Sequence, residues 1–216
     1  KADVGIALDG DADRVIMIDK KGSYINGDHI MAICATEMKN KDKLSKSTIV
    51  ATTMSNLGFE LAMKKKGIKV IRTDVGDRYV VDEMRKNNYN FGGEQSGHII
   101  FFDYIPTGDG TITALQVLDI MKKTGKSLSE LKQIMKTVPQ TIKNINVKEK
   151  KPFEQMSRVI GKIREAEKQL KDNGRIIVRY SGTENKARVM VEGRDEKQIK
   201  EIADNIANEI KKEVGE

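Results

Sequence analysis

A regular alternation of short apolar segments with longer amphipathic ones limits the possible folds of the first two thirds of this chain. The short segments 48–51 and 69–71 are apolar and rich in β-branched residues, whereas 57–66 and 111–122 have the length and periodicity of helices. Strands that alternate with such helices are typical of a mainly parallel sheet covered on both faces. The sequence therefore predicts a three-layer mixed α/β domain that ends near residue 138.

The pattern changes near residues 138 and 139, where a proline stands. Beyond this point the expected order is strand, helix, two strands and a final helix. Both expected helices, 153–170 and 196–212, repeat apolar residues with the 3.6-residue period of a helix that packs on one side. We therefore expect a second, smaller α+β domain over residues 139–216, with both helices on one face of its sheet.

An acidic loop, Asp-Gly-Asp-Ala-Asp-Arg at residues 9–14, follows an apolar segment that we expect to be a buried strand. The carboxylates of Asp9, Asp11 and Asp13 alternate along it. Oxygen ligands suit Mg²⁺, which usually takes one or two carboxylates and leaves its other positions to water or phosphate. The positive charge of Arg14 favours an anion beside the cation, so the loop predicts a magnesium site that shares its space with an anion.

The acidic loop has three alternative interpretations besides a magnesium site. An EF-hand requires glycine at loop position six and glutamate at twelve, where this chain has Arg14 and Lys20, so that interpretation fails. A phosphatase loop with a catalytic Asp-x-Asp usually carries a small residue where this chain has a third aspartate and an arginine, and is disfavoured. An acidic surface turn is the remaining alternative, because Asp and Gly are common in turns.

A second loop, Gly-Gly-Glu-Gln-Ser-Gly-His at residues 92–98, has glycines on both sides that allow close approach of the backbone to a ligand. Glu94, Gln95, Ser96 and His98 supply donors and acceptors suited to hydroxyl or amino groups. The plain alternative is a glycine-rich hairpin with incidental polar residues. We treat His98 by itself as an exposed, solvated side chain.

A third loop, residues 179–185, joins the two strands expected in the small domain. Its phosphate-binding groups would be two arginines, two hydroxyls and the N–H groups near a glycine, contributed by Arg179, Ser181, Gly182, Thr183 and Arg188. Arginine is favoured where phosphate oxygens are recognised by paired hydrogen bonds. The loop is therefore a candidate phosphate site, and a flexible turn is the alternative.

Composition excludes several functions. The net charge is +7, but the lysines are spread along helices and aromatic residues make up 5%, which disfavours a nucleic-acid-binding surface. A mild positive field would attract a small phosphorylated substrate. No apolar segment approaches the ~20 residues of a membrane span, and no signal peptide is apparent. The single cysteine, Cys34, fits a reducing cytoplasm and is expected in the core.

A phosphosugar enzyme needs a magnesium site, a site that hydrogen-bonds sugar hydroxyl groups and a phosphate site, and the three loops together offer all of these. The three motifs, in this order and spacing, resemble those of the α-D-phosphohexomutases over essentially the whole chain. The resemblance implies a four-domain parent protein, in which residues 1–23 end domain 2, residues 24–138 form domain 3, and residues 139–216 form a TATA-binding-protein-like domain 4. The partners would be a phosphosugar and the N-terminal domains, since we expect the chain to begin inside a larger protein.

The resemblance also implies roles for single residues. Asp9, Asp11 and Asp13 would bind Mg²⁺, with Arg14 as an active-site charge beside the transferring phosphate. Glu94 and Ser96 would bind sugar hydroxyls, with Asp77 and Arg78 nearby. The remaining substrate-binding residues would hold the phosphate that is not transferred, and are Arg179, Ser181, Gly182, Thr183 and Arg188.

Some features of the chain refine or depart from this resemblance. Ala12, Gln95 and residues 75–79 are most similar to members that interconvert glucosamine 6-phosphate and glucosamine 1-phosphate, with glucose or mannose phosphates as the alternative. Tyr180 and Asn185 stand where many relatives have proline, a departure that leaves the donors of the phosphate loop intact and its effect on the loop's rigidity open. The phosphoserine segment of the family, Thr-Ala-Ser-His-Asn-Pro, does not occur in this chain. The isolated chain is therefore expected to bind Mg²⁺ and phosphosugar without catalysing the reaction.

Overall fold

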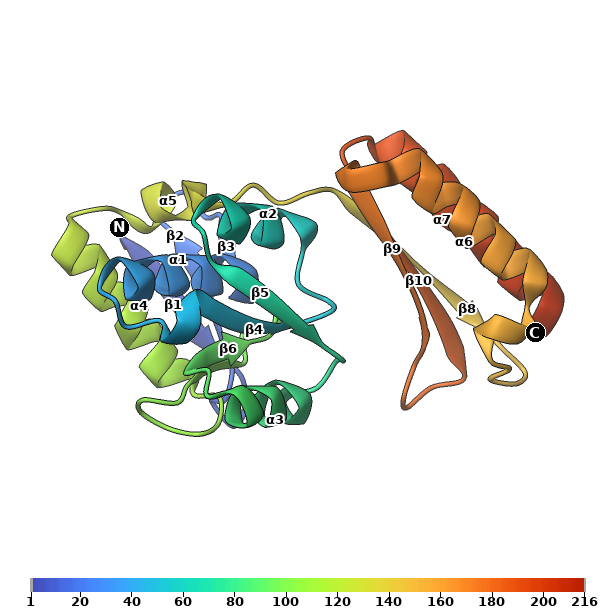
Figure 1. Cartoon of the computed structure of the whole chain (residues 1–216). Helices are drawn as coiled ribbons and strands as arrows, with labels where there is room; N and C mark the ends of the chain where they lie inside the picture. Colours follow the sequence, from blue (N-terminus) through green and yellow to red (C-terminus); the bar gives the residue numbers. More distant parts are fainter. Residues whose placement is uncertain (1, 216) are drawn as a thin grey trace. The chain divides into compact units, whose positions relative to one another are not determined.

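The computed structural model describes residues 2–215 and divides into two compact units, the first ending at Thr137 and the second beginning at Val138 (Figure 1). In the first unit the strands and helices, in chain order, are β1 (Val4–Leu8), β2 (Val15–Asp19), β3 (Tyr24–Ile25), α1 (Gly27–Asn40), β4 (Thr48–Thr52), α2 (Leu57–Lys65), β5 (Lys69–Thr73), α3 (Asp77–Asn87), β6 (Phe91–Gly93), β7 (Ile99–Phe101), α4 (Gly110–Thr124) and α5 (Leu128–Leu131). The division between the units falls beside the predicted boundary at residues 138 and 139.

A four-stranded sheet with the order β5-β4-β6-β7 forms the middle layer of the first unit. Strands β4, β5 and β6 are parallel, whereas β7 runs antiparallel to β6. The connection between β6 and β7 is residues 94–98, which is too short for the crossover that parallel strands require. The predicted mixed α/β class is confirmed, and the glycine-rich loop is the turn of a hairpin at the sheet edge.

The residues of β4 alternate between two apolar cores, as expected for a strand covered on both faces. Ile49 and Ala51 belong to the larger core, which also contains apolar residues of α1, α2 and α4. Val50 points to the opposite side and packs with Val80 and Met84 of α3. The predicted arrangement of helix, sheet and helix layers is therefore present. Cys34 is buried in the larger core, as predicted.

Strands β1, β2 and β3 form a separate antiparallel sheet rather than extending the first one. Met17 and Ile25 on its inner face are fully buried in the larger core. The expectation that the strand before the acidic loop is buried was wrong: within the described chain β1 pairs only with β2, and apart from Val4, which packs on the larger core, its residues are exposed. Ile6 and Leu8 consequently stay 45% and 44% exposed.

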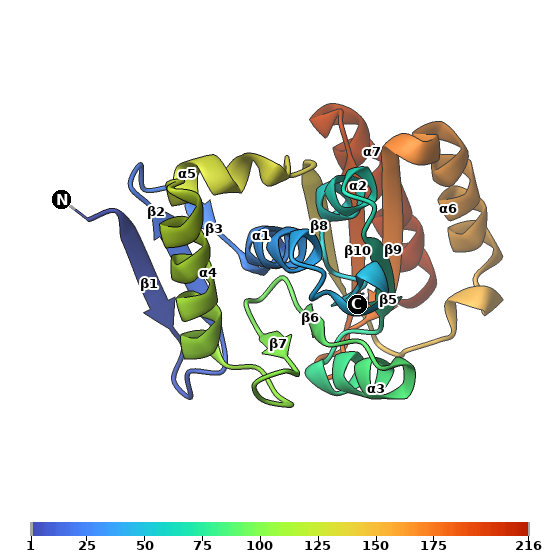
Figure 2. The same ribbon diagram turned by 60° about the vertical axis from the view of Figure 1, so that its left-hand side comes forward.

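The second unit is the predicted α+β domain. Its elements are β8 (Gln140–Asn146), α6 (Ser157–Leu170), β9 (Gly174–Tyr180), β10 (Lys186–Gly193) and α7 (Glu196–Val214). The strands form an antiparallel sheet in the order β8-β10-β9, and both helices lie on one face of it (Figure 2). The helix expected from residue 153 begins at Ser157, because a short 3₁₀ turn precedes it. Among the described residues, no helix combines the length and apolarity needed to cross a bilayer.

Candidate functional site

The acidic loop between β1 and β2 brings its three aspartates together. Asp9, Asp11 and Asp13 each offer one carboxylate oxygen, and these oxygens lie within 4.8 Å of one another. The backbone produces this convergence: Ala12 has a left-handed φ of 59°, and its N–H donates to the carbonyl of Asp9 over 3.2 Å. A turn of this kind directs alternate side chains to the same side, so the predicted cluster exists as a local structure.

Arg14 closes the acidic loop. Its N–H donates to Asp9 Oδ1 over 3.2 Å, and its Nε lies 3.7 Å from Asp9 Oδ2 and 3.6 Å from Asp13 Oδ1. Asp13 Oδ1 is buried and has no hydrogen-bond partner among the described residues. Arg14 offsets part of the charge on this oxygen from 3.6 Å, but a buried oxygen that accepts no hydrogen bond is costly unless a closer cation satisfies it. The donor set therefore fits a hard divalent cation such as Mg²⁺.

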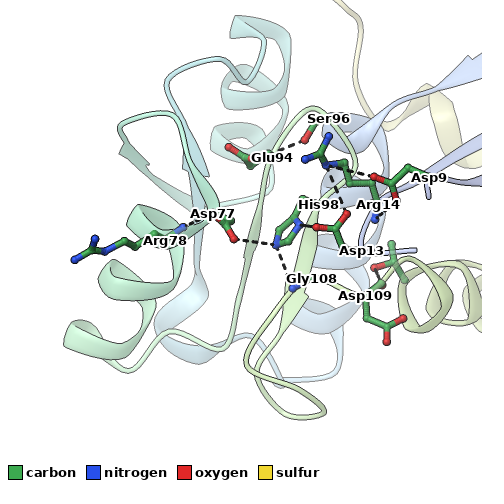
Figure 3. A network of polar contacts seen from close by, with 11 residues as sticks. Asp9, Asp13, Arg14, Asp77, Arg78, Glu94, Ser96, His98, Gly108 and Asp109 are labelled. Atoms are coloured by element: carbon green, nitrogen blue, oxygen red, sulfur yellow. Dashed lines mark hydrogen bonds and ion pairs between the residues drawn. The ribbon is translucent and has the colours of Figure 1, made fainter. Parts of the chain in front are cut away.

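The loop at residues 94–98 lies directly against the acidic loop. The N–H of Val15 donates to the carbonyl of Gly97 over 3.2 Å, and Arg14 forms an isolated bridge with His98. Gly97 has a φ of +97°, and a Cβ there would lie 2.2 Å from the carbonyl oxygen of Val15. Only glycine allows this approach, so the glycine places the two loops in contact (Figure 3).

His98 is the residue that the sequence interpretation misjudged. Its side chain is buried, with 4% of the residue exposed, and Nδ1 lies 3.1 Å from Asp13 Oδ2. The N–H of Gly108 donates to Nε2 over 3.1 Å, so Nε2 is the acceptor and Nδ1 carries the proton given to Asp13. His98 therefore fixes the orientation of one carboxylate in the acidic cluster (Figure 3). His98 directly precedes the apolar strand β7, and this position in the sequence could have indicated that its side chain is buried.

The other predicted sugar-binding residues differ in their surroundings. Glu94 Oε1 accepts a hydrogen bond from the N–H of Gly76 over 3.1 Å, and the hydroxyl of Ser96 lies 3.5 Å from Glu94 Oε2. The carboxylate of Asp77 lies 4.0 Å from His98 Nε2. Arg78 instead points away from this group, with 86% of its side chain exposed and only an ion pair to Asp82 (Figure 3). The structure thus brings Glu94, Ser96 and Asp77 toward His98, but not Arg78.

The amide of Gln95 faces the protein. Its Nε2 donates to Asp28 Oδ2 over 3.0 Å, and Asp28 is fully buried at the start of α1. The same Asp28 oxygen accepts the backbone N–H of Asn56. The backbone carbonyl of Gln95 accepts the N–H of Gly27 over 3.0 Å. Gln95 therefore attaches its loop to α1, and its amide nitrogen is already used within the chain.

The predicted phosphate loop forms the turn between β9 and β10 in the second unit. Arg179 and Arg188 are partners across the two strands, and burial together with the charge of Arg188 lowers the pKa of Arg179. Ser181 is buried, and its hydroxyl accepts the N–H of Glu184 over 3.3 Å. Gly182 and Thr183 at the tip are exposed. Two arginines, the hydroxyls of Ser181 and Thr183 and the backbone N–H groups at the tip are thus collected on one turn.

Tyr180 and Asn185, which stand where many relatives have proline, both make contacts beyond this turn. The hydroxyl of Tyr180 donates to the carbonyl of Lys151 over 2.6 Å, and its ring stacks on Phe153 with centroids 4.4 Å apart. The carbonyl of Asn185 accepts the N–H of Val147 over 3.0 Å. Both ends of the loop are therefore attached to the connection between β8 and α6.

Comparisons with known proteins agree on one family. Residues 26–138 match the family model described as "Phosphoglucomutase/phosphomannomutase, alpha/beta/alpha domain III", and residues 142–209 match that of "Phosphoglucomutase/phosphomannomutase, C-terminal domain". The phosphoglucosamine mutase of Geobacter metallireducens is 56% identical over 100% of this chain. That of Caldanaerobacter subterraneus is 53% identical over 99%. The chain spans about half the length of these relatives, 48% of each.

Solved structures of the same fold also cover nearly the whole chain. The Aspergillus fumigatus N-acetylphosphoglucosamine mutase, solved with GlcNAc-6P and magnesium, matches with a TM-score of 0.78. The match covers 96% of this chain and 48% of that one, at 20% identity. At this identity the similarity concerns the fold alone.

Proposed function

Because the chain belongs to the phosphoglucomutase/phosphomannomutase family, we propose that it is part of a phosphohexomutase that interconverts glucosamine 6-phosphate and glucosamine 1-phosphate. The observation that carries this proposal is the contact of the acidic loop with the loop at residues 94–98, through His98 and Asp13. This contact joins a candidate cation site to polar groups suited to a sugar. Identity above 50% to phosphoglucosamine mutases supports the amino sugar over glucose or mannose.

In this proposal the chain supplies three pieces of the parent protein. Residues 1–23 end domain 2, residues 24–138 form domain 3, and residues 139–216 form domain 4. The parent's other half supplies the rest of the enzyme and the serine that carries the phosphoryl group. The exposed apolar residues Ile6 and Leu8 on edge strand β1 support this assignment, because an edge of this kind is usually covered in a complete protein.

Asp9, Asp11 and Asp13 would hold Mg²⁺, which when bound neutralises charge on the transferring phosphoryl group. Arg14 would bind the oxygens of that group, while Glu94 and Ser96 hydrogen-bond sugar hydroxyls. The serine phosphate is transferred to O1 of glucosamine 6-phosphate, which gives a bisphosphate. The phosphate on O6 then returns to the serine and leaves glucosamine 1-phosphate. Asp77 would lie near the sugar without an assigned contact, whereas Arg78, which points away from this group, has no role in the proposal.

Substitution of Asp11 in the parent enzyme tests the role of the acidic loop. Asp11→Asn should lower turnover roughly 100-fold or more while leaving the circular-dichroism spectrum unchanged, because a metal ligand loses its charge. Asp42→Asn, which changes an exposed aspartate outside the loop, is the matched control and should keep normal turnover. Near-normal turnover of the Asp11 variant would remove this residue from the metal site.

Substrate choice is tested by calorimetric titration of the 216-residue chain in Mg²⁺, with glucosamine 1-phosphate and glucose 1-phosphate side by side. Tighter binding of the amino sugar is expected. Equal binding would leave the family assignment standing and refute the amino-sugar preference. The isolated chain should bind without turnover, and any mutase activity of the purified chain would contradict the assignment of the phosphoryl carrier to the parent's other half.

A further inference from the structure

Glu184, at the end of the phosphate loop, already pairs with two cations of that loop. Its Oε2 accepts a hydrogen bond from Arg188 Nη2 over 2.8 Å, and its Oε1 accepts one from Lys186 Nζ. These hydrogen bonds lower the pKa of Glu184, so it is ionised at neutral pH. The side chain of Glu184 is 42% exposed, so no packed layer holds the carboxylate against its partners.

The two arginines of the loop are in different states. Arg188 is held by Glu184, while its buried Nε has no hydrogen-bond partner among the described residues. Arg179 lies opposite Arg188 on the neighbouring strand, and its guanidinium makes no hydrogen bond or ion pair within the described part of the chain. Like charges on directly opposed residues destabilise a sheet. The two guanidinium groups thus have unused hydrogen-bond donors, and an anion beside them would reduce their mutual repulsion.

The shape of the loop does not depend on the carboxylate of Glu184. The N–H of Ser181 donates to the carbonyl of Lys186 over 2.8 Å, and Lys150 Nζ donates to the carbonyl of Ser181 over 2.8 Å. The anchors of Tyr180 and Asn185 on the connection between β8 and α6 are separate as well. These bonds remain when the charge of Glu184 is removed. The carboxylate therefore acts on the loop mainly through its charge.

We infer that Glu184 is an internal counter-anion of the phosphate site, which pairs with Arg188 and Lys186 when phosphate is absent and weakens phosphate binding. This inference rests on the proposed phosphate-binding role of the loop. Phosphate bound by Arg179, Ser181, Gly182 and Thr183 must displace the carboxylate before it gains Arg188. The loop then holds phosphate less tightly than its cations alone would, and phosphate dissociates from it faster.

Removal of the charge of Glu184 is predicted to strengthen phosphate binding. Glu184→Gln in the 216-residue chain should bind inorganic phosphate roughly 5- to 30-fold more tightly, because a unit charge a few ångströms from the anion is removed and two cations are released. Affinity is measured from the amide signal of Gly182 in a two-dimensional NMR titration at constant ionic strength. The gain should shrink at high salt, because exposed charges are screened.

Matched variants separate charge from structure. Glu184→Asp keeps the charge and should not gain affinity, and the double variant Glu184→Gln with Arg188→Gln should lose most of the gain. Equal or weaker phosphate binding by folded Glu184→Gln, while the wild type binds, would overturn the inference and leave the phosphate site standing. No binding by either protein would refute the phosphate-binding role itself and the inference with it.

Discussion

Acid destabilisation of the first unit should depend on His29. This side chain is 5% exposed in the first turn of α1, and its Nδ1 lies 2.7 Å from Oδ1 of the capping residue Asn26. Because that oxygen accepts, Nδ1 carries the proton of the neutral ring, and a second proton would charge a buried group. Burial, together with the charge of Lys132, lowers the pKa of His29 from 6.5 to about 4.

The sign and size of the effect follow from linkage. In the unfolded chain His29 takes up a proton near pH 6.5, whereas the folded chain resists it until about pH 4. Stability is therefore complete above pH 6.5 and falls as the pH drops toward 4. Each pKa unit corresponds to about 1.4 kcal/mol. His29 should therefore lower the free energy of unfolding by about 2 kcal/mol at pH 5, and by about 3 kcal/mol once the pH is below both pKa values.

Urea unfolding followed by circular dichroism at pH 7.5 and 5.0 measures this loss. His29→Phe keeps a ring of similar size and cannot titrate. Between pH 7.5 and 5.0 its free energy of unfolding should therefore fall by about 2 kcal/mol less than that of the wild type. The chain has two histidines, so NMR titration of their ring protons gives a direct check. The same pH dependence in both proteins, or titration of the wild-type His29 near pH 6.5, would refute the reasoning.

Two further predictions concern the loops. His98→Gln cannot place a donor at the Nδ1 position and should weaken Mg²⁺ binding roughly 10-fold in a calorimetric titration, whereas His98→Asn keeps that donor to Asp13 and should bind nearly as the wild type does. Equal affinities of the two variants would contradict the orienting role. Tyr180→Phe removes the hydrogen bond to Lys151 but keeps the stacked ring, and should destabilise the second unit by about 1 kcal/mol in urea unfolding. A variant as stable as the wild type would show that the ring alone anchors the loop.

Local patterns predicted much of the fold and located the loops. The helix that Asn26 caps, the alternation of strands and helices, and the hairpin around the third loop all depend on residues close together in sequence. The turn that gathers the three aspartates also lies within six residues, so spacing was enough to propose it. The direction of β7 and the exposure of β1 were not predicted, because both depend on which strands become neighbours in space.

The sequence by itself determined the two-part organisation, the class of each part and the chemical character of the three loops, because these follow from periodicity and from the residue types present. The tertiary structure alone decided what each polar side chain does. His98 meets Asp13 from 85 positions away, and Gln95 meets Asp28 from 67. Hydrogen bonds across such distances depend on packed layers that no local pattern encodes, so His98 became a buried orienting group and Gln95 an anchor of its loop.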